Sequence, residues 1–186
     1  MASGVFKIID ARYKRFEKLW KNSYKRAFYA QKLAQQLRHA RISDFAYLAA
    51  LLADIGNMVL LSIDEELIDK LKNIAGFKGI DDSNLLEEIS LGLSHSTLGA
   101  MIGKKWKFNE ALTTAIELAN RPHMAPDHLK SLVYIVYLSN VLVDIENRKM
   151  RFEIIDEDVL EEFNLTEKEV FETIHQKLKE SYKGEG

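Results

Sequence analysis

The sequence contains no cysteine. Disulfide bonds and thiolate metal sites are therefore excluded, which fits a protein of the reducing cytosol. The chain also lacks an excess of either charge, because 26 Lys and Arg residues are balanced by 28 Asp and Glu residues, for a formal charge of −2. Proteins that bind nucleic acids without sequence preference carry a large positive charge, so this composition argues against that class.

Long apolar runs and prolines are equally scarce. The chain has neither a signal peptide nor an uninterrupted run of 18 apolar residues, so we expect a soluble, cytoplasmic protein without membrane contact. The two prolines, Pro122 and Pro126, lie close together and leave the rest of the chain free to be helical. We expect a single domain over residues 1–186, with residues 184–186 as a disordered tail.

Apolar residues follow a helical period along most of the chain. From Ile9 to Leu37 they recur at intervals of three and four, which predicts one long amphipathic helix. Tyr47–Leu61 is apolar nearly all round, which predicts a central helix buried on every side. Capping residues and glycines predict further helices over about 64–75, 83–91, 95–106, 110–119 and 127–145.

The C-terminal part of the chain contains one further helix signal and one weak strand signal. Thr166 to Glu169 forms a capping box that should open a last helix, whereas Arg151 to Ile155 alternates weakly and is expected to be extended. We find no convincing pair of strands. The sequence therefore predicts an all-α protein with two buried helices at its centre.

The N-terminus is unusually apolar for a chain end, through Val5, Phe6, Ile8 and Ile9. These side chains need a packing partner, which is either the core of this chain or a partner chain or neighbouring domain. The long first helix also carries a basic cluster of Lys14, Lys18, Lys21, Lys25, Arg15 and Arg26. We interpret this cluster as the solvated face of the helix, with nucleic acid as the weaker alternative.

Asp54 is the one charged residue inside the apolar central stretch. Removing a carboxylate from water costs several kcal/mol unless it is paired or hydrogen-bonded. The central helix is therefore expected either to carry a functional site or to use Asp54 in a structural contact that holds helices together.

The remaining aromatic and histidine residues have structural interpretations. We predict that Trp20 and Trp106 anchor the core. We expect four histidines to be ordinary surface residues, namely His39, His123, His128 and His175.

Six segments in order resemble the HDOD family, the HD-related output domains of bacterial signalling proteins. They are Leu19–Ser23, Leu51–Leu60, Leu91–Ala100, Trp106–Glu110, Ala115–Pro122 and Leu138–Leu142, followed by the run Asp156–Leu165. The resemblance implies an HD-domain-like helical bundle and kinship with HD phosphohydrolases, which use one or two metal ions to activate water. It covers the later part of an HDOD domain, so the N-terminal lobe of the family is expected to be absent.

The chain departs from the family at most of the metal-binding positions that the resemblance implies. Asn22 and Ala53 stand in place of histidines, Ala119 and Asn120 replace a His-His pair, and Asn140 replaces an aspartate. Only Asp54 and His95 match, and two protein ligands cannot hold a catalytic ion tightly. We therefore expect no metal and no cofactor. The vestigial site, Asn22, Asp54, His95, Asn120 and Asn140, is predicted to be a hydrogen-bond network that satisfies the buried carboxylate.

The resemblance and these departures together predict a non-catalytic signalling or regulatory module. Its expected partners are other signalling proteins or domains in a bacterial cytoplasm, and a homodimer is also open. Two alternatives remain. The first is a metal-dependent phosphohydrolase that has found other ligands, and the second is a sensor that binds a small ligand such as a nucleotide in the vestigial pocket.

Overall fold

The computed structural model describes residues 2–63, 65–78 and 83–184. These residues form α-helices joined by loops and short 3-10 turns, and they contain no strand, which confirms the predicted all-α class. The side chains of Val5, Phe6, Ile8 and Ile9 lie outside the described part of the chain, as do Glu185 and Gly186. Gly184 itself ends the last helix and is not part of a tail.

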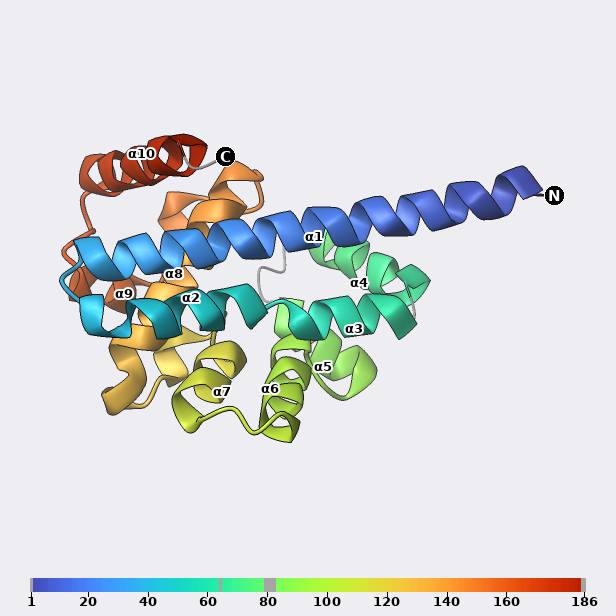
Figure 1. Ribbon diagram of the computed structural model, residues 1–186, viewed down its shortest axis with the longest axis horizontal. Coiled ribbons are helices and arrows are strands. Elements are labelled where there is room, and N and C mark those ends of the chain that lie inside the picture. The colour runs from blue at the N-terminus through green and yellow to red at the C-terminus, as the bar shows by residue number, and fades with distance from the viewer. Residues whose placement is uncertain (1, 64, 79–82, 185–186) are drawn as a thin grey trace.

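The first helix, α1 (Ala2–Gln36), runs along the whole molecule, and its N-terminal end projects beyond the other helices (Figure 1). This confirms the long helix that the apolar periodicity predicts. Its C-terminal half packs against two other helices, where Ala27, Ala30 and Ala34 are fully buried. Because alanine side chains are small, they let the neighbouring helix backbones approach closely. The helix ends at Gln36 and is followed by a turn at Leu37 and Arg38, where Arg38 adopts a left-handed backbone with φ of 65°.

The apolar central stretch forms two helices where one was predicted. α2 (Ser43–Leu52) and α3 (Ile55–Ile63) follow one another beside α1, with a break at Ala53 and Asp54 (Figure 1). The prediction of burial on every side is also wrong, because α2 buries its small residues Ala46, Ala49 and Ala50 while Phe45 and Leu48 are exposed. A helix whose alanine face packs closely on another helix turns its larger side chains outward.

The second predicted core helix is confirmed as α8 (Lys130–Glu146), in which Leu132 to Val143 are all buried. The other helices over 65–117 are α4 (Glu65–Lys78), α5 (Ser83–Leu91), α6 (His95–Lys105) and α7 (Glu110–Glu117). Two predicted caps are confirmed, since Ser94 accepts a hydrogen bond from the Thr97 amide and Asn109 accepts one from the Leu112 amide. Caps of this kind satisfy amides that have no partner within the helix.

The C-terminal part contains α9 (Glu157–Glu162) and α10 (Lys168–Gly184). The expected extended segment at 151–155 is wrong, because Phe152–Ile154 forms a 3-10 turn. The predicted starts of α8 and α10 are each too early by two or three residues. The helix predicted from residue 127 begins with a 3-10 turn at Asp127–Leu129, and α8 follows it. The last helix, α10, begins at Lys168, two residues after Thr166. Helix ends depend on turn geometry that composition alone does not fix.

The buried side chains form two clusters of unequal size. The large core gathers side chains from α1, α2 and α7 to α10, and α8 lies at its centre. A smaller cluster around Leu61 and Leu71 holds Phe16 and Leu19 of α1 against α3 and α4. The predicted tryptophan anchors are wrong, because Trp20 and Trp106 are each 54% exposed.

Two segments, Ala40–Ile63 and Asp127–Glu146, are long and apolar enough by composition to cross a membrane. The second is 67% buried inside the bundle over its apolar window, as expected for a core helix.

Candidate functional site

Asp54 lies at the break between α2 and α3 and is 7% exposed. Its carboxylate pairs with the Arg26 guanidinium of α1, and it also accepts hydrogen bonds from Ser23 at 3.2 Å and Asn57 at 3.3 Å. Arg26 is equally buried and donates a second hydrogen bond, 3.1 Å long, to Asp144 of α8. One guanidinium therefore joins α1, the α2–α3 break and α8, because it pairs with two carboxylates.

The electrostatics of this ion cluster favour the charged forms. Burial by itself would raise the pKa of Asp54, but the positive charge of Arg26 and the hydrogen bonds from Asn57 and Ser23 hold it below its ordinary value. Burial likewise opposes the charge on Arg26, yet Asp54 and Asp144 raise its pKa above the usual value. Asp54 and Arg26 are therefore both charged at neutral pH, and they pair with each other inside the bundle.

His95, the first residue of α6, forms a second buried centre with Glu87 of α5. Its ring Nδ1 donates to Glu87 at 2.6 Å, and its backbone amide donates to the same oxygen at 2.6 Å. On the other side of the ring, the Asn120 amide lies 3.2 Å from Nε2, which accepts its hydrogen bond. Asn140 donates in turn to Asn120 at 3.4 Å and to the Ala119 carbonyl at 3.2 Å. Both ring nitrogens of His95 therefore have partners within the protein.

The structure thus connects three of the five predicted site residues, His95, Asn120 and Asn140, in one chain of hydrogen bonds. Asp54 has its own partners, and within the described part of the molecule Asn22 makes no hydrogen bond to any of the other four. The prediction that the three asparagines satisfy the Asp54 carboxylate is wrong. Ser23, the neighbour of Asn22, is the residue of α1 that donates to Asp54 besides Arg26.

Sequence reasoning missed Arg26, because it assigned this residue to the solvated basic face of α1. A signal was present, since Arg26 follows Ser23 by three residues and precedes Ala30 by four, so helical spacing places it on their buried face. Glu87 and Asp144 were also missed. No local pattern distinguishes them from the many other acidic residues, because their partners come from other helices.

A divalent metal ion, which the HD phosphohydrolases use, does not fit this set of side chains. Among the described residues, no three His, Asp or Glu side chains are placed to hold a metal ion. The two residues that match the metal-binding pattern are both engaged elsewhere, Asp54 by a guanidinium and His95 by Glu87 and Asn120. A cation held next to the Arg26 guanidinium would also meet a like charge.

Glu146, at the end of α8, is the centre of another polar cluster. It accepts hydrogen bonds from Tyr29 at 2.6 Å and His175 at 2.9 Å, and it pairs with Lys25. Burial would raise its pKa, but the hydrogen bonds from His175, Lys25 and Tyr29 lower it to about 2. The surface assignment of His175 is therefore wrong, since the residue is buried at the α1–α8–α10 contact. This cluster fixes α10 on the bundle.

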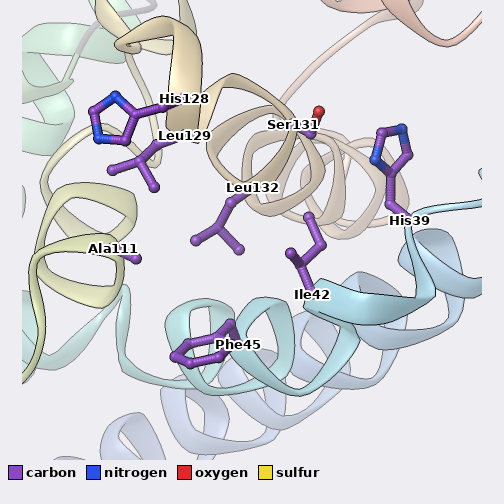
Figure 2. Close-up of a pocket in the computed structure, with 8 residues that line it drawn as sticks. All are labelled: His39, Ile42, Phe45, Ala111, His128, Leu129, Ser131 and Leu132. Atoms are coloured by element: carbon purple, nitrogen blue, oxygen red, sulfur yellow. The ribbon is translucent and has the colours of Figure 1, made fainter.

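A cavity of about 350 Å³ lies on another side of the bundle. Figure 2 shows Ile42, Leu129 and Leu132 around its middle, with His39 and His128 at opposite ends. Phe45, Ala111 and Ser131 complete its lining, so the residues come from α2, α7, α8 and the turns beside them. None of the five predicted site residues lines this cavity. The two imidazoles do not converge on one point, and the lining is mainly apolar.

Three solved structures have the same fold as this chain, each at 20% sequence identity. A candidate phosphohydrolase from Shewanella amazonensis SB2B superposes with a TM-score of 0.64 over 88% of this chain and 59% of that protein. A candidate signal transduction protein from Marinobacter aquaeolei VT8 gives 0.68 over 87% and 35%, and an HDOD domain protein from Geobacter sulfurreducens gives 0.62 over 76% and 48%. The molecule is thus an HD-domain-like helical bundle.

The sequence model of the HDOD domain matches residues 1–122, so the chain belongs to the HDOD family. The segments at 138–142 and 156–165 lie beyond the matched range. An uncharacterised protein of Treponema pallidum (strain Nichols) is 24% identical over 183 residues, which is 98% of this chain and 35% of that protein. The chain therefore spans about a third of the length of this relative.

Proposed function

We propose that this HDOD domain is a non-catalytic, signalling-associated module that works through contact with other proteins. Membership of the HDOD family and the shared fold with a candidate signal transduction protein support the association with signalling. The absence of catalysis is argued from the site itself, where ionic and hydrogen bonds between side chains hold the residues that would otherwise bind a metal.

The observation that carries this proposal is the buried pair of Arg26 and Asp54. HD chemistry needs neutral imidazoles and carboxylates that converge on one ion, and it needs an open coordination position for water. Here a permanently charged guanidinium neutralises the carboxylate, and Ser23 and Asn57 hydrogen-bond to it as well. The arrangement stabilises the fold, and the charge of the Asp54 carboxylate is neutralised without a metal ion.

The proposal is tested by measuring metal content and hydrolysis together. Protein of residues 1–186, purified without added ions, is expected to contain far less than one Mn, Fe or Zn per chain by elemental analysis. It is also expected to show no hydrolysis of a generic phosphodiester above background when Mn²⁺ is added. About one metal ion per chain, or metal-dependent turnover that is lost in Asp54→Ala, would overturn the proposal.

A small-ligand sensor remains the second candidate because of two polar atoms in the same region. Arg26 Nε and Asn140 Oδ1 are both buried without a hydrogen-bond partner among the described residues, and such atoms are potential contacts for a polar ligand. A thermal-shift screen with nucleotides distinguishes the two functions. A ligand that binds only the folded state raises the midpoint, whereas an interaction module shows no shift.

A further inference from the structure

The apolar stripe of α1 continues beyond the part of the helix that the bundle covers. Ala27, Ala30 and Ala34 are buried, whereas Tyr13 is 69% exposed and Trp20 is 54% exposed. Helical spacing places Tyr13 and Trp20 in one row, with Phe16 between them, and this row leads into the buried alanines. Tyr13 and Trp20 therefore form an exposed aromatic surface on the N-terminal half of α1, of the kind that packs on another helix.

This surface is hollowed at the contact between α1 and α3. A groove of about 330 Å³ is lined by Tyr13, Phe16, Glu17, Trp20 and Met58. Phe16 also packs on the small cluster of Leu61 and Leu71, so the floor of the groove belongs to the folded bundle. Large aromatic side chains beside a methionine are typical of surfaces that bind an apolar helix face, because they contribute contact area at low entropic cost.

The charge next to the groove selects the partner. Lys14, Lys18 and Lys21 lie at helical spacing along the neighbouring row of α1. Among the residues that the structure describes, Glu17 is the acidic one that lines the groove, and it pairs with Lys21 at 2.7 Å. A second copy of α1 in the groove would bring its own lysine row against this one, which is unfavourable, whereas acidic side chains would be attracted. The surface thus matches an apolar helix with acidic flanks.

We propose that the α1–α3 groove binds an acidic amphipathic helix of a partner protein. This inference rests on the proposed interaction function and gives it a surface and a partner chemistry. Trp20 and Tyr13 are its apolar contacts, Met58 forms the opposite wall, and the lysine row sets the preference for negative charge. The preference should weaken with salt, because the lysines are solvent-exposed.

The test uses the full chain and a fluorescein-labelled helical peptide of about 18 residues, with leucines on one face and glutamates flanking them. Fluorescence anisotropy should show binding to the wild type and about tenfold weaker binding to Trp20→Ser. Trp106→Ser is the matched control, because Trp106 is also 54% exposed; it should bind like the wild type. Equal losses in the two variants would overturn the proposal.

The charge preference is tested in the same assay. A peptide with lysine in place of glutamate should bind about tenfold more weakly than the acidic one, and Lys18→Glu should reduce that difference. Equal affinity for both peptides, displacement of the acidic peptide by single-stranded oligonucleotide alone, or a dimer in sedimentation that Trp20→Ser dissociates would each overturn the acidic-helix assignment.

Failure of this proposal is distinguishable from failure of the proposed function. The peptide assay reports on the α1–α3 groove, whereas metal content and phosphodiester hydrolysis report on Asp54 and His95.

Discussion

Asp54 illustrates how a buried charge is tolerated by this fold. A carboxylate in the interior costs several kcal/mol, and the cost is offset here by a guanidinium, a hydroxyl and a side-chain amide from three different positions. The arrangement is asymmetric. Arg26 contacts both Asp54 and Asp144, whereas Asp54 has Arg26 as its one cationic partner among the described residues. Loss of Arg26 therefore leaves Asp54 buried without a cationic partner among the described residues, while Asp144 keeps Lys149 at 4.0 Å. Loss of Asp54 leaves Arg26 paired with Asp144.

We therefore predict that Arg26→Met lowers the free energy of unfolding by about 3–5 kcal/mol, and that Asp54→Ala lowers it by a smaller amount. Urea unfolding followed by circular dichroism measures both. Arg15→Met is the control, because Arg15 also pairs with a carboxylate, Asp69 at 2.8 Å, but this pair is much more exposed. It should cost about 1 kcal/mol or less. An Arg26→Met or Asp54→Ala protein as stable as the wild type would contradict a stabilising role of the Arg26–Asp54 pair.

At the scale of elements, the contact between α3 and α6 explains the residue after the break. Gly56 lies so close to the start of α6 that an added Cβ would be 1.9 Å from the His95 carbonyl oxygen and 2.9 Å from the Gly99 amide nitrogen. These neighbours are backbone atoms, so they cannot rotate away as a side chain could. The two helices touch backbone to backbone, and this approach holds His95 in place beside Glu87.

Gly56→Ala is accordingly predicted to lower the free energy of unfolding by about 1–3 kcal/mol or more, because α3 and α6 must separate. Gly103→Ala is the matched control within α6. Its added Cβ would meet side-chain atoms of Thr113 at 3.1 Å and Phe108 at 3.2 Å, which can shift. Alanine also favours the helix by about 1 kcal/mol over glycine, so this variant should stay within about 1 kcal/mol of the wild type. Equal stability losses in thermal unfolding would contradict the close α3–α6 contact.

At the scale of the whole molecule, burial is divided unevenly along α1. Its C-terminal half belongs to the large core around α8, and its N-terminal half meets the small cluster of Leu61 and Leu71 before it projects outward (Figure 1). Local stability follows the number of buried apolar contacts. The region of α3 to α5 should therefore open more easily than the region of α8, although one helix runs through both.

Hydrogen exchange followed by mass spectrometry should show this difference. We predict that amides of α8 exchange at least about tenfold more slowly than those of α4 after correction for intrinsic rates, because α8 opens only with the large core. α10 is the control for a surface helix fixed on the large core through His175 and Glu146, and its protection should be intermediate. Uniform protection of α4 and α8 would show that the bundle opens as one unit.

The sequence by itself determined the features that depend on neighbours three or four residues apart. The existence of one long N-terminal helix and the burial of α8 follow from the helical period. The caps Ser94 and Asn109 follow from side chains that bond to amides nearby. The motif segments also led to the correct family, since six weak signals in order are informative together.

Only the tertiary structure decided which charges are buried. The partners of Arg26 lie 28 and 118 residues further along the chain, and no local pattern specifies which carboxylates will meet it. The break at Ala53 and Asp54 arose in the same way, because a uniformly apolar stretch does not reveal that its one carboxylate must face a cation on α1. A charge is stable in the interior only where distant helices bring a compensating charge to it.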